Sequence, residues 1–157
     1  MDTKTISTQF ELQTRLFNNV LQDIDEQELD RRTSEQVNHL HWLATHLLAI
    51  RMGLRSFGGL SEDNSMQHFL GKSISDIQEY PPLSEIKEKW NEISSDILKG
   101  LQHMNAEQLA GEAPVQVPVS DRTLGGYLGF LMHHEAYHLG QMGILRKHMG
   151  QSAMAYT

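Results

Sequence analysis

The sequence of 157 residues contains no cysteine. Disulfide bonds, thiolate zinc sites and a thiol nucleophile supplied by the protein itself are therefore excluded. Nine histidines are present, so imidazole, together with carboxylate, is the metal-binding chemistry that the side chains offer. A chain without cysteine is also compatible with the reducing cytoplasm, which is where we expect the protein to be located.

Basic residues and long apolar runs are scarce as well. Lys and Arg number 13 against 20 Asp and Glu, which leaves a net charge of −7. This balance argues against a nucleic-acid partner, because such surfaces cluster Lys and Arg. The longest apolar runs are broken by His, Arg or Gly, so we expect no membrane-spanning segment and no membrane partner. The length fits one domain over residues 1–157 that can bury a full core.

Apolar residues recur at steps of three and four along four segments, which predicts four long helices. These are expected at residues 8–30, 33–57, 83–104 and 121–149. Thr33 and Gln36 match a capping box for the second helix, and Gly58-Gly59 are expected to end it. Four helices with almost no strand pattern predict an all-α protein, a four-helix bundle with long crossover connections.

The two long connections carry weaker signals. Residues 58–82 are expected to hold one short helix, at 65–69 or at 73–78. Residues 105–121 look irregular, with 115–119 as an extended strap or short edge strand, and Ser120 or Asp121 is expected to cap the last helix. We expect the glycines inside that helix to mark close approach to neighbouring helices or to a ligand pocket; they are Gly125, Gly126, Gly129, Gly140 and Gly143.

Histidine replaces leucine at two places on the apolar stripe of the last helix. His134 and His138 are four residues apart, so their rings lie one turn apart on one face and can bind the same metal ion. On the second helix, His46 has apolar residues at all four neighbouring helical positions and is expected to face the core. His39 and His41 have polar neighbours and are expected nearer the rim.

Two other interpretations of these histidines remain open. The rings can simply be hydrogen-bonded core residues in a metal-free scaffold. In addition, His134-Glu135-Ala136-Tyr137-His138 matches the H-E-x-x-H pattern of zinc proteases. Such a protease would also need a sheet to hold an extended peptide and a further ligand downstream, where only His148 follows. Burying three imidazoles is costly unless something satisfies them, and a divalent cation does so.

Two neighbours of these histidines are candidates for a supporting role. Glu135 could act as a general base or accept a hydrogen bond from a ligand imidazole. Gln141, one turn beyond His138, could hold the orientation of that ring or contact a substrate. No catalytic residue is assigned.

The chain resembles the DinB/YfiT-like superfamily of four-helix-bundle metalloproteins. The resemblance rests on Trp42-Leu43-Ala44-Thr45-His46 and on His134-Glu135-Ala136-Tyr137-His138-Leu139-Gly140-Gln141, with helix order and total length in agreement. It implies an up-down-down-up bundle, often a homodimer, and a divalent metal, zinc or nickel, held by His46, His134 and His138. Characterised relatives include bacillithiol transferases and thiol-dependent isomerases.

These observations lead to two expectations for function. The first is a metal-dependent enzyme in which the ion activates a low-molecular-weight thiol cosubstrate, as in an S-transferase, or water, as in a hydrolase, toward a small molecule. The second is a non-catalytic metal-binding protein of a stress response. An open coordination position beside a cleft would favour the enzyme.

Overall fold

The computed structural model describes residues 2–55 and 65–157. In these residues the chain forms α-helices, short 3-10 turns and loops, and no strand. The five α-helices are α1 (Thr3–Val20), α2 (Leu40–Met52), α3 (Leu83–His103), α4 (Ala106–Ala110) and α5 (Leu124–His148). The predicted all-α class is confirmed.

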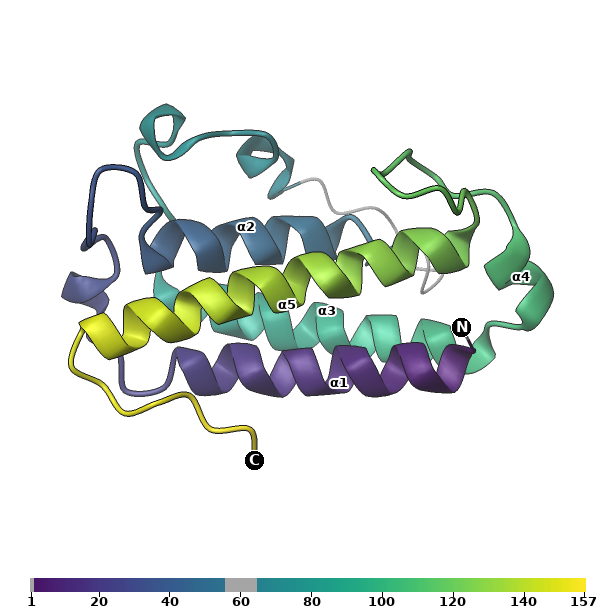
Figure 1. The fold of residues 1–157 in the computed structure, drawn as a ribbon, viewed down its shortest axis with the longest axis horizontal. Coiled ribbons are helices and arrows are strands. Elements are labelled where there is room, and N and C mark those ends of the chain that lie inside the picture. The colour runs from purple at the N-terminus through teal and green to yellow at the C-terminus, as the bar shows by residue number, and fades with distance from the viewer. Residues whose placement is uncertain (1, 56–64) are drawn as a thin grey trace.

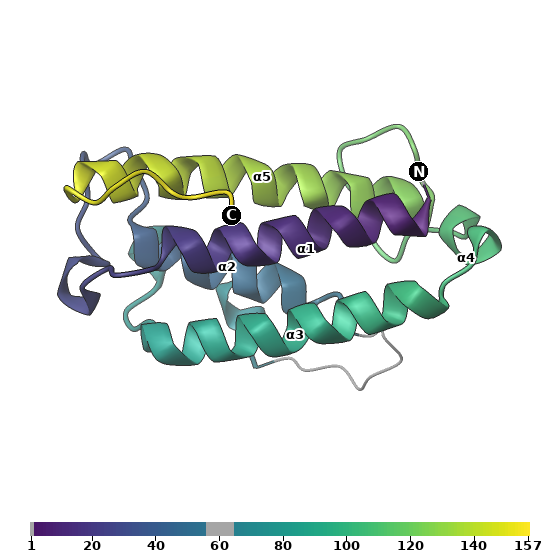
Figure 2. The ribbon, with the colours of Figure 1, turned by 90° about the horizontal axis from the view of Figure 1, so that it is seen from below.

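The four long helices lie side by side as a bundle (Figures 1 and 2). α1 packs against α3 and α5, and α2 packs against the same two helices. The order around the bundle is therefore α1, α3, α2, α5. This order makes α2 and α5 neighbours, although α3 and two long connections separate them in sequence.

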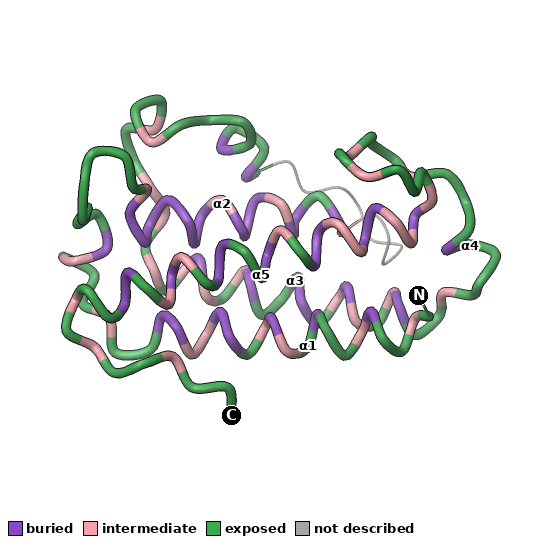
Figure 3. The backbone as a smooth tube through the Cα atoms, in the orientation of Figure 1, coloured by how far each residue is buried: buried purple, intermediate pink, exposed green. Residues whose placement is uncertain are grey.

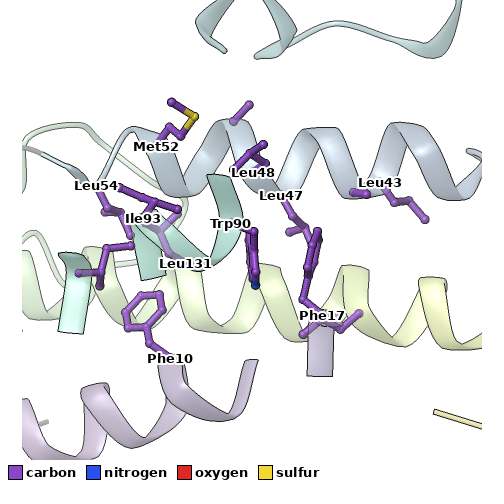
Figure 4. Packing of buried hydrophobic residues seen from close by; sticks show 14 of the residues in the cluster. Phe10, Phe17, Leu43, Leu47, Leu48, Met52, Leu54, Trp90, Ile93 and Leu131 are labelled. Atoms are coloured by element: carbon purple, nitrogen blue, oxygen red, sulfur yellow. The ribbon is translucent and has the colours of Figure 1, made fainter. Parts of the chain in front are cut away.

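Buried residues recur along the parts of these helices that face the bundle interior (Figure 3). In the middle of the core, the rings of Phe17 from α1 and Trp90 from α3 stack with centroids 3.9 Å apart (Figure 4). The regular apolar stripe predicted for the third helix is confirmed by buried Ile86, Ile93 and Ile97. Each such side chain contributes roughly 1.5–3 kcal/mol on burial, so this helix is held by its packing.

The first helix is shorter at its end than predicted. α1 starts at Thr3, where the side chain of Asp2 accepts a hydrogen bond from the amide of Thr5, and it ends at Val20 instead of residue 30. Asp23 then adopts a left-handed conformation with φ of 58°, which short polar side chains tolerate. The acidic stretch that follows forms a loop with one 3-10 turn, Glu26–Glu28. The turn at Asp23 breaks the helical periodicity, although Leu29 in this stretch is still fully buried.

The predicted start of the second helix is wrong. α2 begins at Leu40, where Nδ1 of His39 accepts a hydrogen bond from the amide of Trp42, and not at Thr33. The segment 33–38 is polar apart from Val37, which is itself 38% exposed, so a helix there would have no apolar face against the bundle. α2 ends at Met52; the predicted stop at Gly58-Gly59 lies outside the described residues.

The connections contain more helix than expected. The link before α3 has one 3-10 turn at each predicted position, Gln67–Phe69 and Ile74–Asp76. Residues 105–121 are not wholly irregular, since Asn105 and Gln108 form a capping box that starts α4. Of the two alternatives for 115–119, an extended strap or a short edge strand, the strand is not formed. The only described bridge nearby joins Glu112 and Thr123.

The start of α5 explains one of its glycines. Thr123 caps the helix in place of the predicted Ser120 or Asp121, and the carboxylate of Asp121 instead accepts hydrogen bonds from Thr123. A β-carbon on Gly126 would lie 2.6 Å from Asp121, so this turn requires glycine. Gly140 and Gly143 face open space, and the close approach expected there is wrong.

Within residues 2–55 and 65–157, no helix combines the length and the apolar character needed to cross a bilayer.

Candidate metal centre

The three predicted histidines meet between α2 and α5. His134 and His138 project from successive turns of α5, and His46 projects toward them from α2. Nε2 of His134 lies 3.5 Å from Nε2 of His46 and 3.1 Å from Nε2 of His138. One ring nitrogen from each of the three residues falls within 4.8 Å of the others. The structure therefore gathers one donor atom from each residue around a common point.

The spacing of these nitrogens fits a metal ion. A tetrahedral zinc ion with its usual zinc–nitrogen distance separates two ligand nitrogens by about 3.3 Å. The two Nε2 separations measured at His134 lie on either side of this value. Three neutral imidazoles form a donor set found in catalytic zinc sites. Whether the three residues bind a metal stays a prediction.

Burial keeps all three rings in the form that binds metals. The pKa of His46 is lowered to about 4, first by burial and then by His138 and His134. Burial also lowers the pKa of His134 to about 4, with further contributions from His138 and His133. Burial lowers the pKa of His138, against the hydrogen bond to Gln141, which raises it. At neutral pH the rings are therefore uncharged and present lone pairs.

Gln141 orients one of the rings. Its Oε1 lies 2.7 Å from Nδ1 of His138, and its Nε2 donates to the hydroxyl of Tyr137 at 3.1 Å. An acceptor at Nδ1 places the proton there and leaves Nε2 of His138 free to coordinate. Nδ1 of His46 and Nδ1 of His134 are buried without a hydrogen-bond partner among the described residues, so His138 is the best anchored of the three.

Trp42 holds the ring of His46 from the other side. The two rings, one helical turn apart on α2, stack with centroids 4.6 Å apart and planes 11° from parallel. In the sequence, Trp42 stands out only as part of the motif Trp42-Leu43-Ala44-Thr45-His46, with no role at the centre. The structure shows that its indole fixes the plane of an imidazole at the centre.

Glu135 makes contacts different from those considered for it in the sequence. Its carboxylate is fully buried and accepts two hydrogen bonds from Arg51, at 2.7 and 2.8 Å. It therefore faces the bundle interior, where it is bound to a guanidinium. Among the described residues the Glu135 carboxylate makes no hydrogen bond or ion pair with the three histidine rings, and it is not placed as the general base of an H-E-x-x-H protease.

Two further histidines, at the start of α2, are more buried than predicted. His39 is 6% exposed and caps α2, and His41 is 8% exposed. The ring of His41 lies between the carboxylate of Asp30, at 3.0 Å, and the carbonyl of Pro81, at 2.8 Å. These rings join loops at one end of the bundle and stand apart from the centre formed by His46, His134 and His138.

A cavity lies beside Gln141, the residue that is hydrogen-bonded to His138. It has a volume of about 360 Å³ and lies between the loop before α2 and the last turns of α5, with Val37, Leu43, Gln141 and Ile144 in its lining. It is large enough for a small molecule and is mainly apolar beside the Gln141 amide.

Comparison with known families decides the classification. The profile of the DinB superfamily matches residues 9–142. The chain belongs to the DinB superfamily. The region that matches this DinB profile runs from α1 into α5 and includes all three histidines of the centre, together with Gln141. A search of curated proteins found no match to this DinB-superfamily chain.

Proposed function

We propose that this protein is a metal-dependent enzyme in which His46, His134 and His138 hold one divalent cation, zinc or nickel, through Nε2. The observation that carries the proposal is the convergence of the three nitrogens, since one donor atom from each ring lies within 4.8 Å of the others. Membership of the DinB superfamily supports it, because DinB-like proteins are metal-binding. The substrate is a small molecule.

A divalent ion held by three neutral imidazoles supplies an open coordination position and lowers the pKa of a thiol or water bound there. The chain contributes the geometry. Gln141 fixes the proton of His138 on Nδ1, and Trp42 holds the plane of His46. His46 and His134 are only partly buried, which leaves a path from solvent to the common point.

The absence of cysteine favours a thiol cosubstrate over a protein thiol. If the reaction is an S-transfer, the sulfur must come from a separate low-molecular-weight thiol, because this chain has none of its own. If water takes the same position, the centre acts as a hydrolase. Both chemistries use the same three histidines, so they differ in the molecule that reaches the centre.

We further propose an up-down-down-up order of the helices, a homodimer and a cytoplasmic location. The helix order is supported by Figures 1 and 2, where the colours of α1 and α5 progress opposite to those of α2 and α3. The dimer and the location rest on the family resemblance and on the absence of cysteine. Gel filtration at two protein concentrations tests the dimer.

The first experiment measures metal content by elemental analysis of protein purified without a histidine tag. We expect one zinc or nickel per chain. A chain that remains metal-free after incubation with either ion, although folded, would show that the histidines only hydrogen-bond one another.

The second experiment separates the chemistries. The metal-loaded protein is incubated with glutathione or bacillithiol and a panel of small electrophiles, and in parallel with small esters and amides, each with a chelator control. Metal-dependent conjugation supports the transferase, and metal-dependent hydrolysis without thiol supports the hydrolase. A stoichiometric metal with no turnover in either arm would favour the non-catalytic stress-response protein.

A further inference from the structure

The centre of the bundle contains a fully buried ion pair next to the histidines. Arg51 follows His46 on α2, and Glu135 directly follows His134 on α5. Both side chains have no exposed surface, and the guanidinium binds the carboxylate through two parallel hydrogen bonds, from Nε to Oε1 at 2.7 Å and from an Nη to Oε2 at 2.8 Å. The pair thus joins the two helices that carry the metal centre.

The remaining donors of Arg51 reach the other two helices. The guanidinium donates to the hydroxyl of Thr14 at 2.7 Å and to the carbonyl of Phe10 on α1, and to the hydroxyl of Ser94 on α3. Its carbon lies 3.7 Å from the ring centre of Trp90. All five N–H groups of an arginine therefore have acceptors, and one side chain contacts α1, α3 and α5 from α2.

Stability alone does not account for this arrangement. Removing two charges from water costs as much as their attraction returns, and apolar replacements of buried ion pairs are often neutral or stabilising. The best supported use of a buried polar group is to select one packing register among several. The buried pair of Arg51 and Glu135 is therefore best explained as a device that selects one packing arrangement of the helices.

α5 buries one apolar stripe but also carries apolar side chains outside it. Leu145 is 2% exposed, yet its neighbour Ile144 is 60% exposed and Tyr137 is 59% exposed. A rotation of α5 would therefore cost less apolar burial than it would for a helix whose outer face is entirely polar. One residue step rotates a helix by about 100°, enough to turn His134 and His138 away from α2.

We propose that Arg51 and Glu135 are positioning residues that fix the rotation and height of α5 against α2, so that His134 and His138 meet His46. This inference rests on the proposed metal-binding function. With the carboxylate of Glu135 held in the interior by two hydrogen bonds, the preceding residue His134 is directed to the rim between α2 and α5, where His46 lies.

The test compares metal binding with folding in the full chain. The double variant Arg51→Met/Glu135→Leu replaces the pair by apolar side chains of similar size. We expect it to fold, with a thermal midpoint near that of the wild type in chelator, and to bind Co²⁺ and Zn²⁺ about 10-fold or more weakly. We also expect altered visible absorption bands of bound Co²⁺, because the ligand geometry changes. Wild-type affinity together with a wild-type Co²⁺ spectrum would overturn the proposal.

A second variant decides the matter if the double variant does not fold. Arg51→Lys keeps the charge but loses the two parallel hydrogen bonds, so we expect a folded protein with weaker metal binding and a changed Co²⁺ spectrum. Metal binding unchanged from wild type in Arg51→Lys would overturn the proposal.

The matched control is Arg146→Met. Arg146 is a buried arginine like Arg51, but it lies on α5 and binds the carbonyls of Val20 and Ser152 at the far end of the bundle. We expect lower stability and unchanged metal affinity; a similar loss of affinity there would show a general structural effect and overturn the assignment. If the wild type itself binds no Co²⁺, the metal-binding function fails first, whereas equal binding by wild type and double variant removes only the positioning role.

Discussion

Oε1 of Gln141 lies 2.7 Å from Nδ1 of His138 on the same face of α5. A carbonyl oxygen only accepts, so the proton of the ring is on Nδ1 and the lone pair of Nε2 points toward His46 and His134. The Nε2 of the same amide donates to the hydroxyl of Tyr137. One short chain of hydrogen bonds thus determines the tautomer of a metal-ligand candidate.

Replacing this amide should weaken metal binding without unfolding the protein. In Gln141→Ala the ring of His138 loses its acceptor, and we expect the metal affinity to fall by about 10- to 100-fold. Competition with a coloured chelator measures the affinity. Gln102→Ala, at an exposed position of α3, should bind metal as the wild type does. Equal affinities for the two variants would contradict the role of Gln141.

Removing a proposed ligand should abolish stoichiometric binding. We expect His138→Ala to retain far less than one metal per chain after desalting, because two imidazoles bind much more weakly than three. His103→Ala is the control, since His103 lies at the end of α3 and outside the cluster. Elemental analysis of both variants gives the answer, and the same metal content in both would refute the ligand assignment.

The metal-free protein should lose stability as the pH falls. The folded-state pKa values of His46 and His134 are lowered to about 4, and that of His138 is also lowered, while an unfolded histidine titrates near 6.5. Between these values the unfolded chain binds more protons, so the free energy of unfolding rises with pH. The contribution is complete above about pH 6.5 and is lost toward pH 4.

Urea titrations in EDTA from pH 4.5 to 7.5 measure this dependence. The lower limit of pH 4.5 keeps the titration above the pH range in which the carboxylates of Asp2, Asp76 and Asp121 become protonated, because their pKa values are lowered from 3.8. His39, whose pKa burial also lowers, adds a change of the same sign. The variant His46→Gln should show a shallower slope. A stability that is constant or rises on acidification would contradict the prediction.

Removing only one partner of the buried ion pair should strongly destabilise the protein. Glu135→Leu leaves the guanidinium of Arg51 buried without its carboxylate, and we expect a loss of about 3–5 kcal/mol in the free energy of unfolding. The exposed pair of Arg31 and Glu28 is the comparison, because Glu28→Ala should change stability by less than about 1 kcal/mol. Urea denaturation compares the two; similar losses would show that burial of the pair does not govern its energetics.

Sequence periodicity predicted the elements that are governed by a continuous apolar face. The stripe from Leu83 places the ends of α3 within one residue of those observed. Periodicity failed in the acidic stretch after Val20, where a left-handed turn at Asp23 interrupts the helix. It also failed in the polar stretch before Leu40, where no apolar face exists. There, local hydrogen bonds of Asp25 and His39 decide the conformation, and a histidine cap is easily overlooked.

For the centre, spacing along one helix was informative and pairing between helices was not. The four-residue step from His134 to His138 predicted that these two rings share a face, and the apolar neighbours of His46 predicted that it faces the core. The resemblance to the DinB/YfiT-like superfamily supplied the set of three. The partner of Glu135 could not be predicted in the same way, because no local pattern connects it to Arg51. The available signal was that Arg51, a charged residue, lies in an otherwise apolar part of its helix and therefore needs a buried partner.

The neighbouring positions of α2 and α5 have a consequence for how the proposed metal ion would be acquired. His46 and His134 are separated by 88 positions in sequence, so a chain that has not yet docked its last helix cannot bring all three imidazoles to one ion. An ion that binds all three would load only after assembly and would bridge the second and last long helices. Its release and the undocking of α5 would be linked equilibria, in which chelation favours opening and metal supply favours closure.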